Sequence, residues 1–259
     1  MERASAPPAA PEKGTDRYEI GTGGSVLAQS DLVIDWENLP TYNTIMALAA
    51  GAGLVLLVRL ARDLLTNRSD TSADGYALAF GVLGSILVTT GLHMTLTWPL
   101  APDFSFDNII FGEPALLFGF MLLAVATFAW RRGRQLLDDG DVIARAAAIA
   151  RPMAPVIIGA GLSLLAIAAA GMSNQLFTAP PQEPVSGWVA GLHPWLEPTF
   201  ISGLYALTSV GALATPSAIA GNDRARVIAG WTLSIAGWIF LLFGAFNYFS
   251  HIGLAVDTM

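Results

Sequence analysis

The sequence contains no cysteine, a single lysine and few charged residues of either sign. Without cysteine, the chain has no disulfide, no thiolate ligand for zinc or an iron–sulfur cluster, and no thiol nucleophile. The formal net charge is −7 and the one lysine is Lys13, so no basic patch is present that could neutralise a run of phosphates. These absences exclude nucleic acid as a partner. They also leave histidine, methionine and carboxylate as the side chains that could bind a metal.

Long apolar segments dominate what is present. Of 259 residues, 54% are hydrophobic and 13% are charged, and the mean hydropathy is +0.56. A helix needs about 20 apolar residues to cross a bilayer, and six segments are that long. They cover approximately residues 42–64, 76–98, 108–130, 153–176, 198–220 and 227–251. We therefore expect an all-α integral membrane protein, with a bundle of six transmembrane helices over residues 41–255 surrounded by lipid.

Arginine is concentrated in alternate connections between these segments. The connections 99–107 and 177–197 contain neither lysine nor arginine, whereas the other three hold ten of the arginines: Arg59, Arg62, Arg68, Arg131, Arg132, Arg134, Arg145, Arg151, Arg224 and Arg226. Short connections that carry positive charge stay on the cytoplasmic side. The pattern predicts a multi-pass protein of the cytoplasmic membrane with both termini exoplasmic. Residues 1–40 would then form an exoplasmic, polar, proline-rich tail.

The helices that run inward begin in a similar way. An acid is followed closely by a proline at 37–40, 113–114 and 197–198, and Glu37, Glu113 and Glu197 are 76 and 84 positions apart. Three tandem helical hairpins of the same orientation would be related by a pseudo-threefold axis along the membrane normal. Capping is the alternative explanation, because proline and an acid both suit the first turn of any helix.

The three histidines are the candidate metal ligands. His93, His193 and His251 all fall at exoplasmic helix ends, and Glu113 is expected in the same half of the bundle. Imidazole with a carboxylate suits copper or zinc, so the sequence predicts a metal site formed by these four residues. Haem between His93 and His251 is the less favoured cofactor. No two histidines are three or four positions apart, and ordinary interfacial histidines remain the alternative.

Two short motifs carry a family resemblance. The stretch from Gly91-Leu92-His93 through Trp98-Pro99, followed by the residues Asn-Ile-Ile-Phe-Gly-Glu-Pro at 108–114, resembles an uncharacterised bacterial and archaeal membrane family, domain of unknown function 981. The resemblance covers roughly residues 40–255. It implies an integral membrane protein without an assigned activity, so it transfers no functional residue to this chain.

The sequence carries no complete catalytic signature, neither a phosphate-binding glycine loop nor a nucleophile elbow. We therefore expect an accessory or structural subunit of a larger membrane complex of respiratory or oxidase type. The proline-rich tail and the uncharged outer connections would contact other membrane protein subunits. Two alternatives stay open: a redox protein that binds copper, zinc or haem through the histidines, and a small-solute transporter centred on Glu113.

Overall fold

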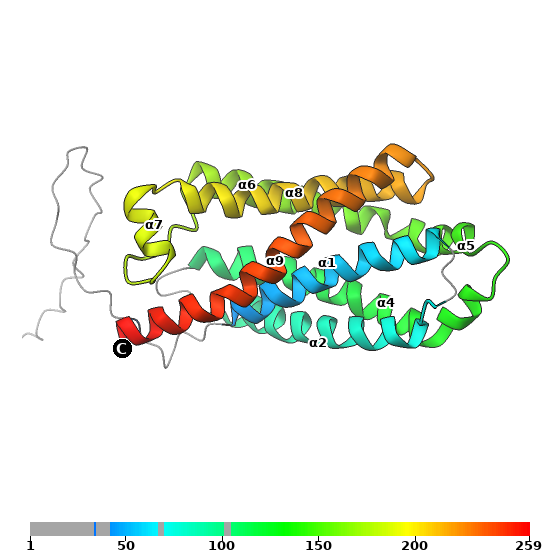
Figure 1. Cartoon of the computed structure of the whole chain (residues 1–259), viewed down its shortest axis with the longest axis horizontal. Helices are drawn as coiled ribbons and strands as arrows, with labels where there is room; N and C mark the ends of the chain where they lie inside the picture. The colour runs from blue at the N-terminus through cyan, green and yellow to red at the C-terminus, as the bar shows by residue number, and fades with distance from the viewer. Residues whose placement is uncertain (1–33, 35–41, 67–69, 101–104) are drawn as a thin grey trace, which may run out of the picture. The chain divides into compact units, whose positions relative to one another are not determined.

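The computed structural model describes residues 34, 42–66, 70–100 and 105–259, and this part of the chain is helical with no strand. The predicted tail, residues 1–40, lies outside the described residues except for Ile34. The elements in order are α1 (Asn43–Leu65), α2 (Ala73–Thr97), the π-helix η1 (Asn108–Gly112), α4 (Glu113–Leu137), α5 (Val142–Ala150), the short 3₁₀-helix η2 (Arg151–Met153), α6 (Ala154–Ser173), α7 (Ser186–Leu192), α8 (Leu196–Ile219) and α9 (Asp223–Thr258) (Figure 1).

Five helical segments are long and apolar enough to cross a membrane, which fits a multi-pass membrane protein. These are Asn43–Leu65, Ala73–Thr97, Ser105–Leu137, Val142–Ser173 and Asp223–Thr258. Helix α8 coincides with the predicted span 198–220 but is not among the five. Its 24 residues include Thr208, Ser209 and Pro216, which lower its apolar content.

The long helices pack as a ring in the order α1, α2, α4, α6, α8, α9. The most extensive contacts join α2 to α4, α1 to α9 and α6 to α8. Contacts of α8 with α9 and of α1 with α2 come next, whereas α4 and α6 touch each other least. In Figure 1, α1 and α9 cross in front of the other helices. The ring is therefore tightly packed everywhere except between α4 and α6.

Glycine brings the backbones of neighbouring helices into contact. A Cβ atom added at Gly51 of α1 would lie 2.6 Å from the carbonyl oxygen of Gly237 in α9. At Gly91 of α2, it would lie 2.6 Å from the amide nitrogen of Leu116 in α4. Lipid tails are as apolar as leucine, so close backbone packing takes the place of the hydrophobic effect in holding such helices together.

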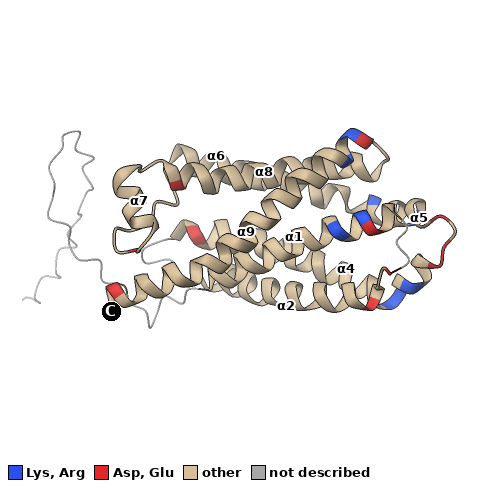
Figure 2. Ribbon diagram, in the orientation of Figure 1, with Lys and Arg blue, Asp and Glu red and all other residues tan. Residues whose placement is uncertain are grey.

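The two ends of the ring differ in charge. We call them the α5 end and the α7 end, after the short helix found at each. All nine arginines of the described residues lie at the α5 end, in the last turns of α1 and α4, in α5 and η2, and at the start of α9 (Figure 2). Arg134 of α4 pairs there with Asp74 of α2, and Arg226 pairs with Asp223 at 2.9 Å. The α7 end holds carboxylates and the three histidines.

Replacing a contact glycine by alanine tests the packing. Gly51→Ala should lower the free energy of unfolding by roughly 1–3 kcal/mol, because the new methyl group overlaps the backbone of α9. Gly203→Ala in α8 is the matched control, since a Cβ there meets nothing within 4 Å, and alanine should leave stability unchanged or raise it by up to about 1 kcal/mol. Thermal unfolding in detergent measures both. Equal stability of the two variants would contradict the packing described here.

Candidate functional site: an apolar cavity inside the helix ring

The helix ring surrounds a cavity of about 1840 Å³. Residues of α1, α4, α5, α6, α8 and α9 form its walls, and α2 contributes only Ala73 and Tyr76. Ordinary ligand pockets have volumes of roughly 300–1000 Å³. The cavity is therefore large enough for a molecule longer than most soluble substrates.

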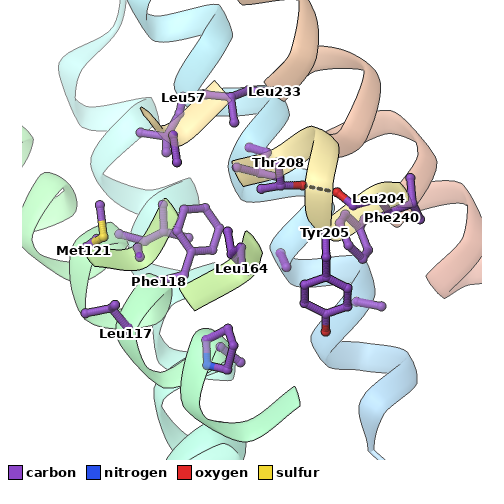
Figure 3. Close-up of a pocket in the computed structure, with 18 of the residues that line it drawn as sticks. Leu57, Leu117, Phe118, Met121, Leu164, Leu204, Tyr205, Thr208, Leu233 and Phe240 are labelled. Atoms are coloured by element: carbon purple, nitrogen blue, oxygen red, sulfur yellow. Dashed lines mark hydrogen bonds between the residues drawn. The ribbon is translucent and has the colours of Figure 1, made fainter. Parts of the chain in front are cut away.

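Apolar side chains form the middle of the cavity. Figure 3 shows Leu117, Phe118 and Met121 of α4 on one side and Leu204 and Tyr205 of α8 on the other. Thr208 also lines this region, but its hydroxyl donates to the carbonyl oxygen of Leu204 at 2.8 Å, so it offers the cavity little polarity. The middle of the cavity thus matches a hydrocarbon better than a water-soluble molecule.

The π-helix η1 builds one wall near the α7 end. Asn108, only 1% exposed, joins it to the preceding loop: its Oδ1 accepts from the Leu100 amide, and its Nδ2 donates to the Ser105 carbonyl, both at 3.2 Å. The buried Tyr205 hydroxyl donates to the Ile110 carbonyl oxygen at 3.1 Å. Single π-turns inside α-helices occur frequently at functional sites. Here the π-turn leads directly from Asp107 to Glu113, and both residues line the cavity.

The connection 177–197 forms the wall at the α7 end. The Phe177 ring stacks on that of Tyr205, with centroids 6.1 Å apart. The buried Glu183 carboxylate caps the start of α7: its Oε2 accepts hydrogen bonds from the amides of Val185, Ser186 and Gly187. The Glu197 Oε2 accepts from the Ala179 amide at 2.9 Å. These two acids hold the connection in place.

His93 is held away from the cavity. Its Nδ1 lies 2.6 Å from the Tyr42 hydroxyl, which precedes α1. Burial raises the pKa of the Tyr42 phenol, so the hydroxyl keeps its proton and stays available for this hydrogen bond. Which of the two groups donates depends on the tautomer of the His93 ring. His93 does not line the cavity.

The other predicted metal ligands have separate environments. Glu113 and His251 both line the cavity, and His251 Nδ1 lies 3.0 Å from the Asn247 carbonyl oxygen in its own helix. His193 follows α7, is exposed and does not line the cavity. No hydrogen bond or ion pair joins any two of the four among the described residues, and this part of the chain brings no group of three histidines or acids together to hold a metal ion. The copper, zinc or haem site stays a prediction without support from the geometry.

Sequence reasoning missed the residues that now define the site. Asp107 was assigned to a connecting loop, and Tyr205 and Phe177 were not singled out. A signal for Tyr205 was available, because a tyrosine in the middle of an apolar helix must find a partner for its hydroxyl. Which carbonyl accepts that hydrogen bond depends on the π-turn, and the sequence pattern shows no such turn.

Comparison with known proteins identifies one family. The sequence model of the family described as protein of unknown function (DUF981) matches residues 40–253. No curated protein and no solved structure matches the chain. The family match covers the helix ring except for the last residues of α9, and nearly all the residues that line the cavity lie within it.

The pairing of Tyr42 with His93 can be tested by removing one hydroxyl. Tyr42→Phe should lower the free energy of unfolding by about 1 kcal/mol, because His93 Nδ1 loses its hydrogen-bond partner. Tyr248→Phe is the control, since Tyr248 is exposed and has no hydrogen-bond partner in the described part of the chain. Thermal unfolding in detergent compares the two. A loss of similar size in both variants would show that the hydrogen bond contributes nothing specific.

Proposed function

The chain belongs to the DUF981 family of proteins of unknown function, and from its geometry we propose that it is a multi-pass membrane protein that binds a lipid-like molecule in the cavity of its helix ring. The observation that carries the proposal is a cavity of about 1840 Å³ whose middle is apolar. An empty space of that size would cost the surrounding side chains their packing contacts. A hydrocarbon chain from the bilayer would restore them.

The least packed part of the ring is the route by which such a molecule would enter. Helices α4 and α6 both line the cavity yet touch each other least of all neighbours in the ring. Gly159 of α6 meets nothing within 4 Å, unlike the contact glycines of the other helix pairs. With the ring in a bilayer, an opening between these two helices faces the hydrocarbon. The ligand would then pass from lipid to cavity without crossing water.

This proposal includes α8 as a sixth spanning helix. Helix α8 packs against α6 and α9, both of which are long and apolar enough to span. One of its buried polar residues is bonded to a neighbouring helix: the Ser209 hydroxyl donates to the Gly161 carbonyl oxygen of α6 at 2.6 Å. A polar residue that is bonded to a neighbouring helix is compatible with membrane depth.

The contacts between the predicted hairpins fit the threefold repeat, whereas the contacts within the hairpins differ, with α4 and α6 touching least. Each extensive pair joins the second helix of one predicted hairpin to the first helix of the next: α2 to α4, α6 to α8, and α9 to α1. A cyclic arrangement of three hairpins would repeat its contacts in this way. We retain the pseudo-threefold axis as part of the proposal.

The accessory-subunit role remains a second candidate, and one observation favours it. Helix α7 exposes Trp188 (69%) and Leu192 (58%), which another subunit could cover. A subunit that co-purifies in fixed ratio and is lost from Trp188→Ser would support this role. A single chain of constant mass in both preparations would count against it. For the transporter alternative, the apolar walls match a hydrophobic cargo better than a water-soluble solute.

Narrowing the cavity should weaken lipid binding. Leu164→Trp places a larger side chain on the cavity wall, whereas Leu165→Trp makes the same change on an adjacent residue that is 47% exposed and lies outside the cavity. Native mass spectrometry of protein extracted from membranes should show bound lipid on the wild type and on Leu165→Trp, and at least fivefold less on Leu164→Trp. Equal lipid content in both variants, with both folded, would refute the proposed function.

Orientation can be tested with introduced cysteines because the chain has none of its own. Gly140 and Gly191 are exposed, and a Cβ at either meets nothing within 4 Å, so both accept a cysteine without strain. With the arginine-rich α5 end in the cytoplasm, Gly191→Cys should react with an impermeant thiol reagent in intact cells and Gly140→Cys only after lysis. The reverse pattern would place the termini in the cytoplasm.

A further inference from the structure

We infer that the ligand of the cavity is an amphiphile that lies with its head at the α7 end, and that this head carries hydrogen-bond donors and no negative charge. The inference rests on the proposed function and names the chemical class of the molecule that binds. It follows from where the cavity is polar, from two acceptors there that lack donors, and from the charges of the walls.

The polarity of the cavity changes along its length. Its middle is lined by leucine, phenylalanine and methionine of α1, α4 and α6. Amide and carboxyl side chains line the α7 end: Asn43, Asp107, Asn174, Gln175, Glu197 and Asn247. A molecule with one apolar chain and one polar head matches both regions in a single orientation. A plain hydrocarbon would leave this polar end without hydrogen-bond partners in the ligand.

Two of these polar groups have acceptor atoms without a donor. The Oδ1 atom of Asn43, at the start of α1, is buried and has no hydrogen-bond partner. The Asp107 carboxyl, which lines the cavity just before η1, accepts no hydrogen bond and forms no ion pair among the described residues. Buried acceptors such as the Asn43 Oδ1 atom are nearly always paired in proteins. A head with N–H or O–H groups would supply the missing donors.

The wall charges select against an anionic head. Four carboxyl groups line the α7 end of the cavity, those of Asp107, Glu113, Glu183 and Glu197, and His251 is the one basic side chain described beside them. The arginines that line the cavity, Arg62 and Arg226, lie at the α5 end. Carboxyl groups give an anionic head no positive partner, and where they are ionised they repel it. A phosphate or carboxylate head is therefore disfavoured, and an amine or hydroxyl head fits.

Competition between three probes of equal chain length tests the inference. Hexadecylamine, hexadecanol and hexadecanoate are added together to the delipidated full-length protein in detergent, and the bound species are counted by native mass spectrometry. We expect the amine and the alcohol each to exceed hexadecanoate at least tenfold. Asp107→Asn should lower the amount of bound hexadecylamine about tenfold relative to bound hexadecanol, because it removes the carboxyl group that pairs with the amine. Asp257→Asn, an exposed acid at the same end outside the cavity, should leave the ratio within twofold.

The outcomes separate this inference from the proposed function. If hexadecanoate binds as well as the amine, and Leu164→Trp removes both, the cavity binds lipid but the inferred head chemistry is wrong. If Asp107→Asn and Asp257→Asn change the ratio equally, the selectivity comes from overall charge, and the placement of the head at Asp107 is refuted. If none of the three probes binds in a manner sensitive to Leu164→Trp, the proposed function itself fails.

Discussion

Backbone contact at glycine is the interaction on which the rest of this structure depends. In a bilayer, apolar side chains gain little by leaving lipid for the interior of a protein, so helices associate where their backbones can approach closely. Gly51 of α1 lies against α9, Gly91 and Gly119 join α2 to α4, and Gly161 of α6 faces Leu213 of α8. The ring is held by these contacts at its circumference. Its interior therefore does not need to be filled by the chain's own side chains, and the cavity is the result.

Much of the fold could be predicted because the pattern of apolar and charged residues indicates where each helix begins and ends in the membrane. The apolar lengths predicted the positions of the long helices to within a few residues at most ends, and the placement of arginine predicted which helix ends lie together. Local geometry could not be predicted in the same way. The π-turn at Asn108–Gly112 is joined by the Asn108 side chain to the loop just before it, and α7 begins where the Glu183 carboxylate accepts from its first amides. These contacts are close in sequence, but a pattern of apolar lengths does not indicate which side chains make them.

The predicted metal site shows the limit of sequence reasoning about function. Topology places His93, Glu113 and His251 at one depth, but it does not say which way each side chain faces around its helix. A rotation of 100° per residue separates neighbours on a helix. His93 consequently faces α1, where Tyr42 meets it, whereas Glu113 and His251 face the cavity. The depth of a residue in the membrane could be derived from its own helix alone. The direction in which its side chain faces depends on how all the helices pack.

The order of the helices in the ring has a consequence for how the protein is made. Among the described helices, α1 leaves the ribosome before the others, yet its most extensive contacts are with α9, which follows all of them. Chains are inserted from the N-terminus onward as they are produced. The glycine face of α1 is therefore without its main partner until α9 has been synthesised, and α9 completes the ring.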